Sequence, residues 1–130
     1  MGNDLWKLTA AKITDGIATK SFSASEVVQS HLHHIEKVNS KVNAIVTLDE
    51  EFATLQAKKV DKRVKEGKKL RPLEGVPIGI KDTTAVKGMR TTHGSKFFEH
   101  HIPDNDDIIV DRIKASGAII LGKTNTPEFA

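Results

Sequence analysis

The sequence of 130 residues contains no cysteine and no tyrosine, and its aromatic residues are five phenylalanines and one tryptophan. Without cysteine the chain can form neither a disulfide framework nor a thiolate nucleophile, so we propose no redox role, and a reducing cytoplasm is permitted. No apolar run approaches the roughly 20 residues of a membrane-spanning helix, and residues 1–6 lack the basic start and apolar stretch of a signal peptide. We therefore expect a cytoplasmic protein with no membrane partner.

Lysine and arginine outnumber aspartate and glutamate by 20 to 17, which gives a formal net charge of +3. The basic residues are scattered, apart from a cluster within residues 58–69. A cluster of this kind on one amphipathic segment is typical of the solvated face of a surface helix. Because few aromatic side chains are present to stack on bases, we expect no nucleic-acid partner.

Helical spacing of apolar residues recurs in several segments, each bounded by capping or glycine signals. Ser23 and Glu26 have the spacing of a capping box, in which the serine accepts from a backbone N–H and the glutamate reaches back. Gly67 and Gly117 follow the last apolar positions of two segments, where glycine often ends a helix. Helices are expected over residues 4–18, from 23 to about 39, from 49 to 67 and from 104–107 to 117.

Three histidines, His31, His33 and His34, fall on the second of these helices. Two of them, His31 and His34, are three residues apart and could share a metal ion. The same helix face offers neither a carboxylate nor a further histidine to complete a ligand set. We therefore predict no metal site.

Residues 43–48, 76–81 and 118–121 have the composition of strands, and the last is continuously apolar, as in a strand buried on both faces. The order of helices and strands predicts an α/β fold, a mixed β-sheet covered by helices. Residues 83–106 show no sustained period. An irregular stretch of this length is usually functional or lacks structural neighbours.

The strand at residues 76–81 alternates two kinds of side chain and ends on Lys81. One face carries Val76, Ile78 and Ile80, and the other carries Pro77, Gly79 and Lys81. A lysine in this place is either a surface residue that extends its amine to water or a desolvated amine that acts as a base. Residue types alone favour the surface interpretation and leave the other open.

Residues 117–124 match the phosphate-binding pattern G-x-x-x-x-G-K-[ST]. A phosphate loop needs its four middle residues in a tight turn that leads at once into a helix. Here those four residues are strand formers, and Asn125, Thr126 and Pro127 favour a turn instead of a helix. We predict no nucleotide site, and we place Lys123 at the end of a buried strand, where site residues collect in α/β folds.

Four ordered motifs, residues 73–82, 88–95, 116–125 and 128–130, resemble the amidase signature family in sequence and spacing. The preceding helices resemble the N-terminal region of that family, so the resemblance covers nearly the whole chain. It implies that residues 1–130 form the N-terminal part of an amidase signature domain, with a mixed sheet that is incomplete.

Enzymes of this family hydrolyse or transfer amide groups with a Ser, cis-Ser, Lys triad and use no metal or organic cofactor. The resemblance implies that Lys81 is the triad lysine, buried beside small neighbours, which takes a proton through the bridging serine from the nucleophilic serine. It also implies a small-molecule amide substrate, with Met89, Thr91 and Thr92 as walls of its site. Asp82 is expected to anchor the following turn, with an ion pair to a neighbour as an alternative.

In the family, the bridging and nucleophilic serines lie in a Gly/Ser-rich segment a few tens of residues beyond a motif like residues 123–125. The 130 residues contain no Gly-Gly-Ser-Ser segment, so we expect this chain alone to be inactive. Three alternatives stay open: part of an amidase, part of the amidase subunit of a tRNA-dependent amidotransferase, and a non-catalytic interaction or assembly module. Thr126 and Pro127 before Glu128 favour the first over the second. An incomplete sheet further predicts a homo-oligomer formed through an exposed sheet edge or apolar surface.

Overall fold

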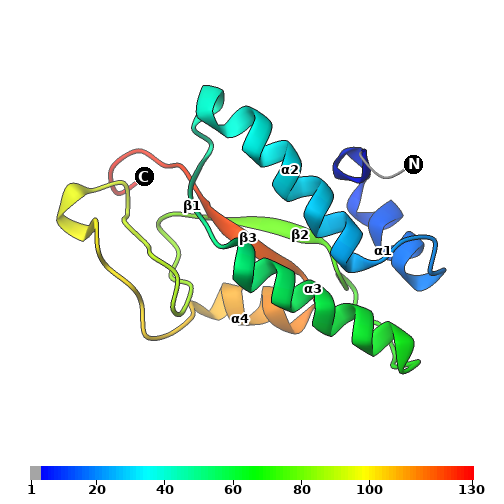
Figure 1. The fold of residues 1–130 in the computed structure, drawn as a ribbon. Coiled ribbons are helices and arrows are strands. Elements are labelled where there is room, and N and C mark those ends of the chain that lie inside the picture. Colours follow the sequence, from blue (N-terminus) through cyan, green and yellow to red (C-terminus); the bar gives the residue numbers. More distant parts are fainter. Residues whose placement is uncertain (1–3) are drawn as a thin grey trace.

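The computed structural model describes residues 4–130, which form a three-stranded sheet with helices on both faces (Figure 1). Residues 1–3, on which the signal-peptide prediction partly rests, lie outside the described residues. The elements are η1 (Leu5–Lys7), α1 (Ala10–Ala18), α2 (Ala24–Val42), β1 (Ile45–Leu48), α3 (Glu50–Lys65), β2 (Pro77–Lys81), η2 (Lys96–Phe98), α4 (Ile108–Ala115) and β3 (Ile119–Thr124). The predicted α/β fold with a mixed sheet is confirmed.

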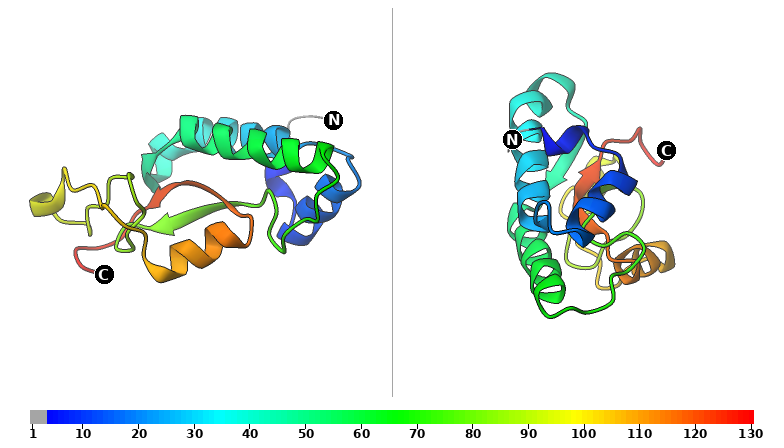
Figure 2. Two further views of the ribbon diagram at one scale, coloured as in Figure 1. Left: turned by 90° about the horizontal axis from the view of Figure 1, so that it is seen from below. Right: turned by 90° about the vertical axis from the view of Figure 1, so that its right-hand side faces the viewer.

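The sheet has the order β1-β3-β2, so that β3 lies in the middle. β3 is antiparallel to β1 and parallel to β2. Figure 2 shows α2 and α3 on one face of the sheet and α4 on the other. Residues 119–123 of β3 are all buried, as the continuous apolar run predicted. Among residues 4–130, no strand pairs with the side of β2 that faces away from β3.

The two faces of the sheet carry separate apolar clusters. The cluster under α1, α2 and α3 includes Ile119 and Leu121 of β3. The cluster toward α4 contains Ile80, Val86, Met89, Val110 and Ile120. Alternate residues of β3 therefore point to opposite faces, which is the regular pattern of a strand.

A β-bulge interrupts this alternation in β3. Ile78 pairs with Ile120, but the next residue of β2, Gly79, pairs with Gly122. Leu121 is therefore an extra residue, and a bulge of this kind changes the face to which the following side chains point. Beyond it, Lys123 pairs with Ile80, a member of the cluster on the α4 face.

The helix-start signals in the sequence act as predicted. Ser23 N donates to the Glu26 carboxylate at 2.8 Å, and Glu26 N donates to Ser23 Oγ at 3.1 Å, which completes the capping box. Asp61 of α3 adds a second cap, since its carboxylate accepts from Ala24 N at 2.7 Å and from Ser25 N at 3.2 Å. A carboxylate at the N-terminus of α2 also interacts favourably with the dipole of that helix. Asp61 therefore joins the C-terminal part of α3 to the N-terminus of α2.

Element boundaries differ from the prediction in three places. The helix predicted over residues 4–18 is split into η1 and α1, because Thr9 is extended and its hydroxyl accepts from Lys12 N at 3.3 Å to start a new helix. α2 continues past residue 39 to Val42, and Asn43, predicted to lie in a strand, ends it in the left-handed region at φ 48°. Asparagine tolerates that conformation better than most residues. β3 extends beyond residue 121 to Thr124.

No helix within residues 4–130 is long and apolar enough to cross a bilayer.

Candidate active site

Lys81 and Lys123 lie at the same end of the sheet. β2 and β3 are parallel, and Lys81 pairs with Thr124 while Lys123 pairs with Ile80. The carboxyl ends of parallel strands are where site residues collect in α/β folds. The structure therefore places both lysines at the carboxyl ends of the parallel strands, where the sequence had placed Lys123.

The burial expected for Lys81 is not observed in residues 4–130. Its side chain is exposed, as is the neighbouring Gly79. The physical reason is the position of β2 at the edge of the described sheet, with no strand beside it. The role of Lys81 as a base stays a prediction, and its surroundings here are those of an accessible amine.

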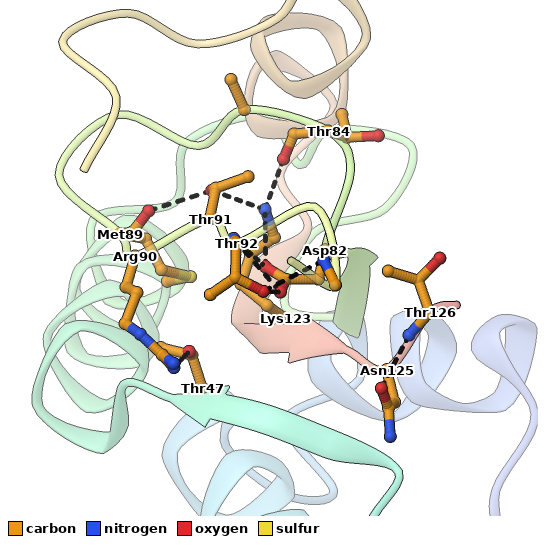
Figure 3. Close-up of polar contacts among 12 residues, drawn as sticks. Thr47, Asp82, Thr84, Met89, Arg90, Thr91, Thr92, Lys123, Asn125 and Thr126 are labelled. Atoms are coloured by element: carbon orange, nitrogen blue, oxygen red, sulfur yellow. Dashed lines mark hydrogen bonds and ion pairs between the residues drawn. The ribbon is translucent and has the colours of Figure 1, made fainter. Parts of the chain in front are cut away.

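The buried lysine is Lys123, which is 0% exposed. Its Nζ donates to the carbonyl oxygen of Thr84 and to Thr91 Oγ1, the latter at 2.8 Å. The same Nζ lies 3.7 Å from Asp82 Oδ1 (Figure 3). Burial lowers the pKa of Lys123, and the nearby Asp82 carboxylate opposes that shift.

Asp82 anchors the turn after β2, as the sequence predicted, and also forms the ion pair. Its side chain is 1% exposed. The carboxylate accepts from Thr92 N at 3.2 Å and from the Thr92 hydroxyl. The Asp82 carbonyl accepts from His93 N at 2.9 Å. The loop between residues 82 and 93 is thus closed at its base by hydrogen bonds to one aspartate.

The three predicted wall residues, Met89, Thr91 and Thr92, are all buried. Met89 belongs to the apolar cluster on the α4 face, and Thr91 Oγ1 donates to the Met89 carbonyl at 3.1 Å. Within residues 4–130 these side chains therefore contact the interior of the loop, and their part in binding a substrate stays a prediction.

The model of the amidase family matches residues 26–130. The chain belongs to the amidase signature family. This match covers both lysine motifs and the loop between them, so the family resemblance predicted from the sequence is confirmed.

The curated relatives of this amidase-family chain include a glutamyl-tRNA(Gln) amidotransferase subunit from Streptomyces coelicolor, which is 45% identical over 98% of this chain and 26% of the relative. The corresponding subunit from Cutibacterium acnes is 42% identical over the same shares of the two chains. The chain thus spans about a quarter of the length of the curated relatives it matches.

Solved structures of the family have the same fold. Native peptide amidase from Stenotrophomonas maltophilia superposes with a TM-score of 0.91 at 26% identity, over 98% of this chain and 26% of that one. A chain from a vestigial protein complex that reveals the origins of an s-triazine catabolic enzyme gives 0.91 at 33% identity, over 95% and 27%. The mixed sheet covered by helices is therefore an arrangement that this chain shares with about a quarter of each of these solved chains.

Two residues of this amidase-family site were not predicted as such. The sequence placed Lys123 at a strand end, but its contacts with Thr84 and Thr91 were not expected. Arg90 was not singled out, yet its guanidinium donates to the Glu99 carbonyl at 2.5 Å and to Thr47 Oγ1 at 3.0 Å, which joins the loop to β1. For Lys123 the available signal was a lysine two positions after the apolar run of residues 118–121, because a lysine at the end of a buried strand requires buried partners.

The histidines of α2 have structural contacts. His31 Nδ1 lies 2.8 Å from the Val27 carbonyl, and the His34 ring stacks on Trp6 with centroids 3.5 Å apart. The structure contains no group of three or more metal-ligating side chains within the described residues 4–130. Residues 119–124, six of the eight that matched a phosphate-loop pattern, form strand β3.

Proposed function

We propose that this chain supplies the lysine-bearing part of an amide-cleaving site of the amidase signature type, with Lys81 as the base. The observation that carries the proposal is the presentation of Lys81: its amine is accessible, while the next residue, Asp82, is buried and hydrogen-bonded. A base must be reached by the hydroxyl it serves, on a backbone that holds it in place. The exposed edge of β2 meets both requirements.

In the proposed reaction, the neutral Lys81 amine accepts a proton, through a bridging serine, from the serine that attacks the amide carbonyl carbon. The new C–O bond forms as the carbonyl oxygen becomes an oxyanion. The proton held on Lys81 then passes to the leaving nitrogen as the C–N bond breaks. Water cleaves the acyl-serine ester by the same proton route. Both serines belong to the Gly/Ser-rich segment of the family, and none of the 130 residues forms such a segment.

This mechanism predicts that the purified 130-residue chain does not hydrolyse simple aryl or aliphatic amides, because it lacks the nucleophile. Release of the amine product, followed by absorbance or by ammonia detection, measures this directly. Turnover that disappears in Lys81→Ala would contradict the requirement for the family serines.

A hybrid protein tests the role of Lys81. Residues 1–130 replace the matching 26% of the Stenotrophomonas maltophilia peptide amidase, which superposes on this chain with a TM-score of 0.91, and are joined to its serine-bearing remainder. We expect Lys81→Met to lower kcat of the hybrid by roughly 10²- to 10⁴-fold, the usual contribution of a general base. Lys62→Met is the matched control, because Lys62 is exposed on α3 and its amine lies 3.8 Å from the carboxylate of Glu66. Equal activity of the Lys81→Met hybrid and its parent would sink the proposal.

The amidotransferase alternative has its own support. The curated relatives named above share 45% and 42% identity with this chain and carry that function in their names, whereas the solved peptide amidase shares 26%. An amidotransferase passes the released nitrogen to an acceptor. A gene product that contains these residues would then release ammonia from an amide donor faster when glutamyl-tRNA(Gln) and partner subunits are present. Release that ignores both additions would favour a stand-alone amidase, as Thr126 and Pro127 suggested.

We also propose that the protein is cytoplasmic and forms a homo-oligomer, as predicted from the sequence.

The non-catalytic interaction module is the remaining alternative. It predicts that Lys81→Met leaves the rate of amide cleavage unchanged in every assay.

A further inference from the structure

Lys123 is a fully buried charged group that the proposed chemistry does not use. A fully buried ammonium is costly unless hydrogen bonds and an opposite charge compensate it. An apolar side chain at this position of β3 would extend the buried run of residues 119–121 without that cost. The presence of a lysine here therefore calls for a role that an apolar residue could not fill.

The bulge at Leu121 determines where the Lys123 amine lies. If side chains alternated regularly along β3, Lys123 would share the face of Ile119 and Leu121, toward α2 and α3. With it, Lys123 pairs with Ile80 and its amine reaches the loop on the opposite face. Bulges recur beside active sites, where they redirect single side chains.

The redirected amine binds three points of one loop. Figure 3 shows the contacts converging on Nζ from the Thr84 carbonyl, the Thr91 hydroxyl and the Asp82 carboxylate. These partners lie at the start and the end of the loop, and Thr92 closes it through Asp82. One buried cation therefore connects both ends of the loop to the middle strand of the sheet.

The same contacts fix the backbone of Lys81. Thr84 N donates to the Lys81 carbonyl at 3.0 Å, while the Thr84 carbonyl is held by Lys123. Asp82 N donates to the Thr124 carbonyl at 3.0 Å, while the Asp82 side chain faces Lys123. The residues on the carboxyl side of Lys81 thus depend on the buried lysine for their positions.

We propose that Lys123 is a positioning residue, whose buried amine holds residues 82–92 in place and so fixes the strand end that carries Lys81. The inference rests on the proposed function only in naming Lys81 as the group that is positioned. Lys123 itself does not touch the substrate in this scheme. Its effect travels through the Asp82 carboxylate, the Thr84 carbonyl and the Thr91 hydroxyl.

Two substitutions of Thr91 in the 130-residue chain test the proposal. Thr91→Val keeps the shape and removes the hydroxyl that accepts from Lys123 and donates to the Met89 carbonyl, while Thr91→Ser keeps the hydroxyl. Amide hydrogen exchange by NMR is read at Thr84, Thr92 and His93, the amides that donate to Lys81 and Asp82. A hydrogen bond to a charged group predicts exchange about 10- to 100-fold faster in Thr91→Val, and rates within about threefold of the parent in Thr91→Ser.

Lys123→Met removes the amine itself and is compared with Lys62→Met, which removes an exposed lysine of α3. We expect Lys123→Met to accelerate exchange at the same three amides by at least as much as Thr91→Val, with the amides in the middle of α2 unchanged. The parent should also show a protected lysine ammonium resonance in a ¹H–¹⁵N correlation, absent from Lys123→Met. Should Lys123→Met fail to fold, the Thr91 pair decides.

Equal exchange in Thr91→Val and Thr91→Ser would overturn the proposal, and so would acceleration spread evenly over α2 and the loop. A purely packing role for Thr91 predicts the reverse order, because valine fills the site better than serine. The measurement needs no substrate and no serine nucleophile. The exchange rates can therefore contradict the positioning role of Lys123 while the hybrid supports Lys81 as the base. They can also support that positioning role while the hybrid contradicts the role of Lys81.

Discussion

A single buried charge gives this chain a pH-dependent stability of known sign. Burial lowers the pKa of Lys123, and the carboxylates of Asp82 and Asp107 oppose the shift without cancelling it. In the unfolded chain a lysine keeps its proton up to about pH 10.4. Between the lowered folded pKa and that value, the unfolded state binds more protons than the folded state. The free energy of unfolding therefore rises with pH across this window.

This linkage predicts a difference between the parent chain and Lys123→Met. Urea unfolding measured at intervals from pH 7 to pH 10.5 should show a rise in the free energy of unfolding for the parent that the variant lacks. Other lysines titrate in both proteins, so their contributions cancel in the difference. Parallel pH curves for the two proteins would show that the Lys123 amine has the same proton affinity folded and unfolded.

The two lysines also show how far residue-level prediction reached. The pattern of residues 76–81 and the family motif identified Lys81, and the structure leaves it accessible at the strand end. Which lysine is buried could not be predicted, because the burial of Lys123 depends on a bulge in the pairing of β3 with β2. The exposure of Lys81 likewise depends on what lies beside β2. The apolar run before Lys123 indicated a buried strand, but the bulge that directs its amine arises from pairing between distant segments and leaves no local signal.

At the scale of elements, the connection into β3 depends on a glycine. Gly117 has φ +96°, a conformation that side chains rarely adopt. A Cβ at this position would lie 2.9 Å from Glu74 Cα and 3.0 Å from Arg71 Nε. Those two residues form an ion pair in which Glu74 is buried and Arg71 is partly exposed, with Arg71 Nη2 2.5 Å from Glu74 Oε1. The turn before β3 is therefore packed against the Arg71–Glu74 ion pair, which precedes β2.

Gly117→Ala is predicted to lower the free energy of unfolding by about 2–4 kcal/mol, from backbone strain together with a close contact against backbone atoms. Gly67→Ala is the matched control, because Gly67 has φ +67° with no atom within 4 Å of the added Cβ. That variant has strain alone and should lose about 1 kcal/mol. Denaturant unfolding of both variants checks the difference, and equal losses would mean that the contact at Gly117 relaxes freely.

Local signals predicted the elements better than they predicted the element boundaries. The capping box at Ser23 and the glycine after α3 were correct because each involves residues close in sequence. At the start of α4, the side chain of the N-cap residue Asp107 accepts from Ala85 N at 2.7 Å instead of from its own helix. A side chain with two available partners cannot be assigned from sequence, because the distant partner is known only after folding.

At the scale of the whole molecule, the described surface exposes large apolar side chains. Phe97 of η2 is 87% exposed, and Ile108 and Ile109 of α4 are 70% and 56% exposed. The outer edge of β2 adds unpaired strand backbone. Exposed apolar side chains and strand edges favour association. The chain spans about a quarter of the length of its curated relatives, and we expect further parts of a family domain to pack on these surfaces.

We therefore expect the purified 130-residue chain to self-associate, and Ile109→Lys to weaken that association by placing a charge on the exposed face of α4. Leu55→Lys is the matched control, because Leu55 is a comparably exposed apolar residue, 50% exposed on α3, which covers the other sheet face. Sedimentation velocity over a range of concentrations measures both. A parent chain that sediments as one monomeric species and unfolds cooperatively would refute the expectation. Equal weakening by both substitutions would instead attribute association to general surface hydrophobicity, with no preference for the α4 face.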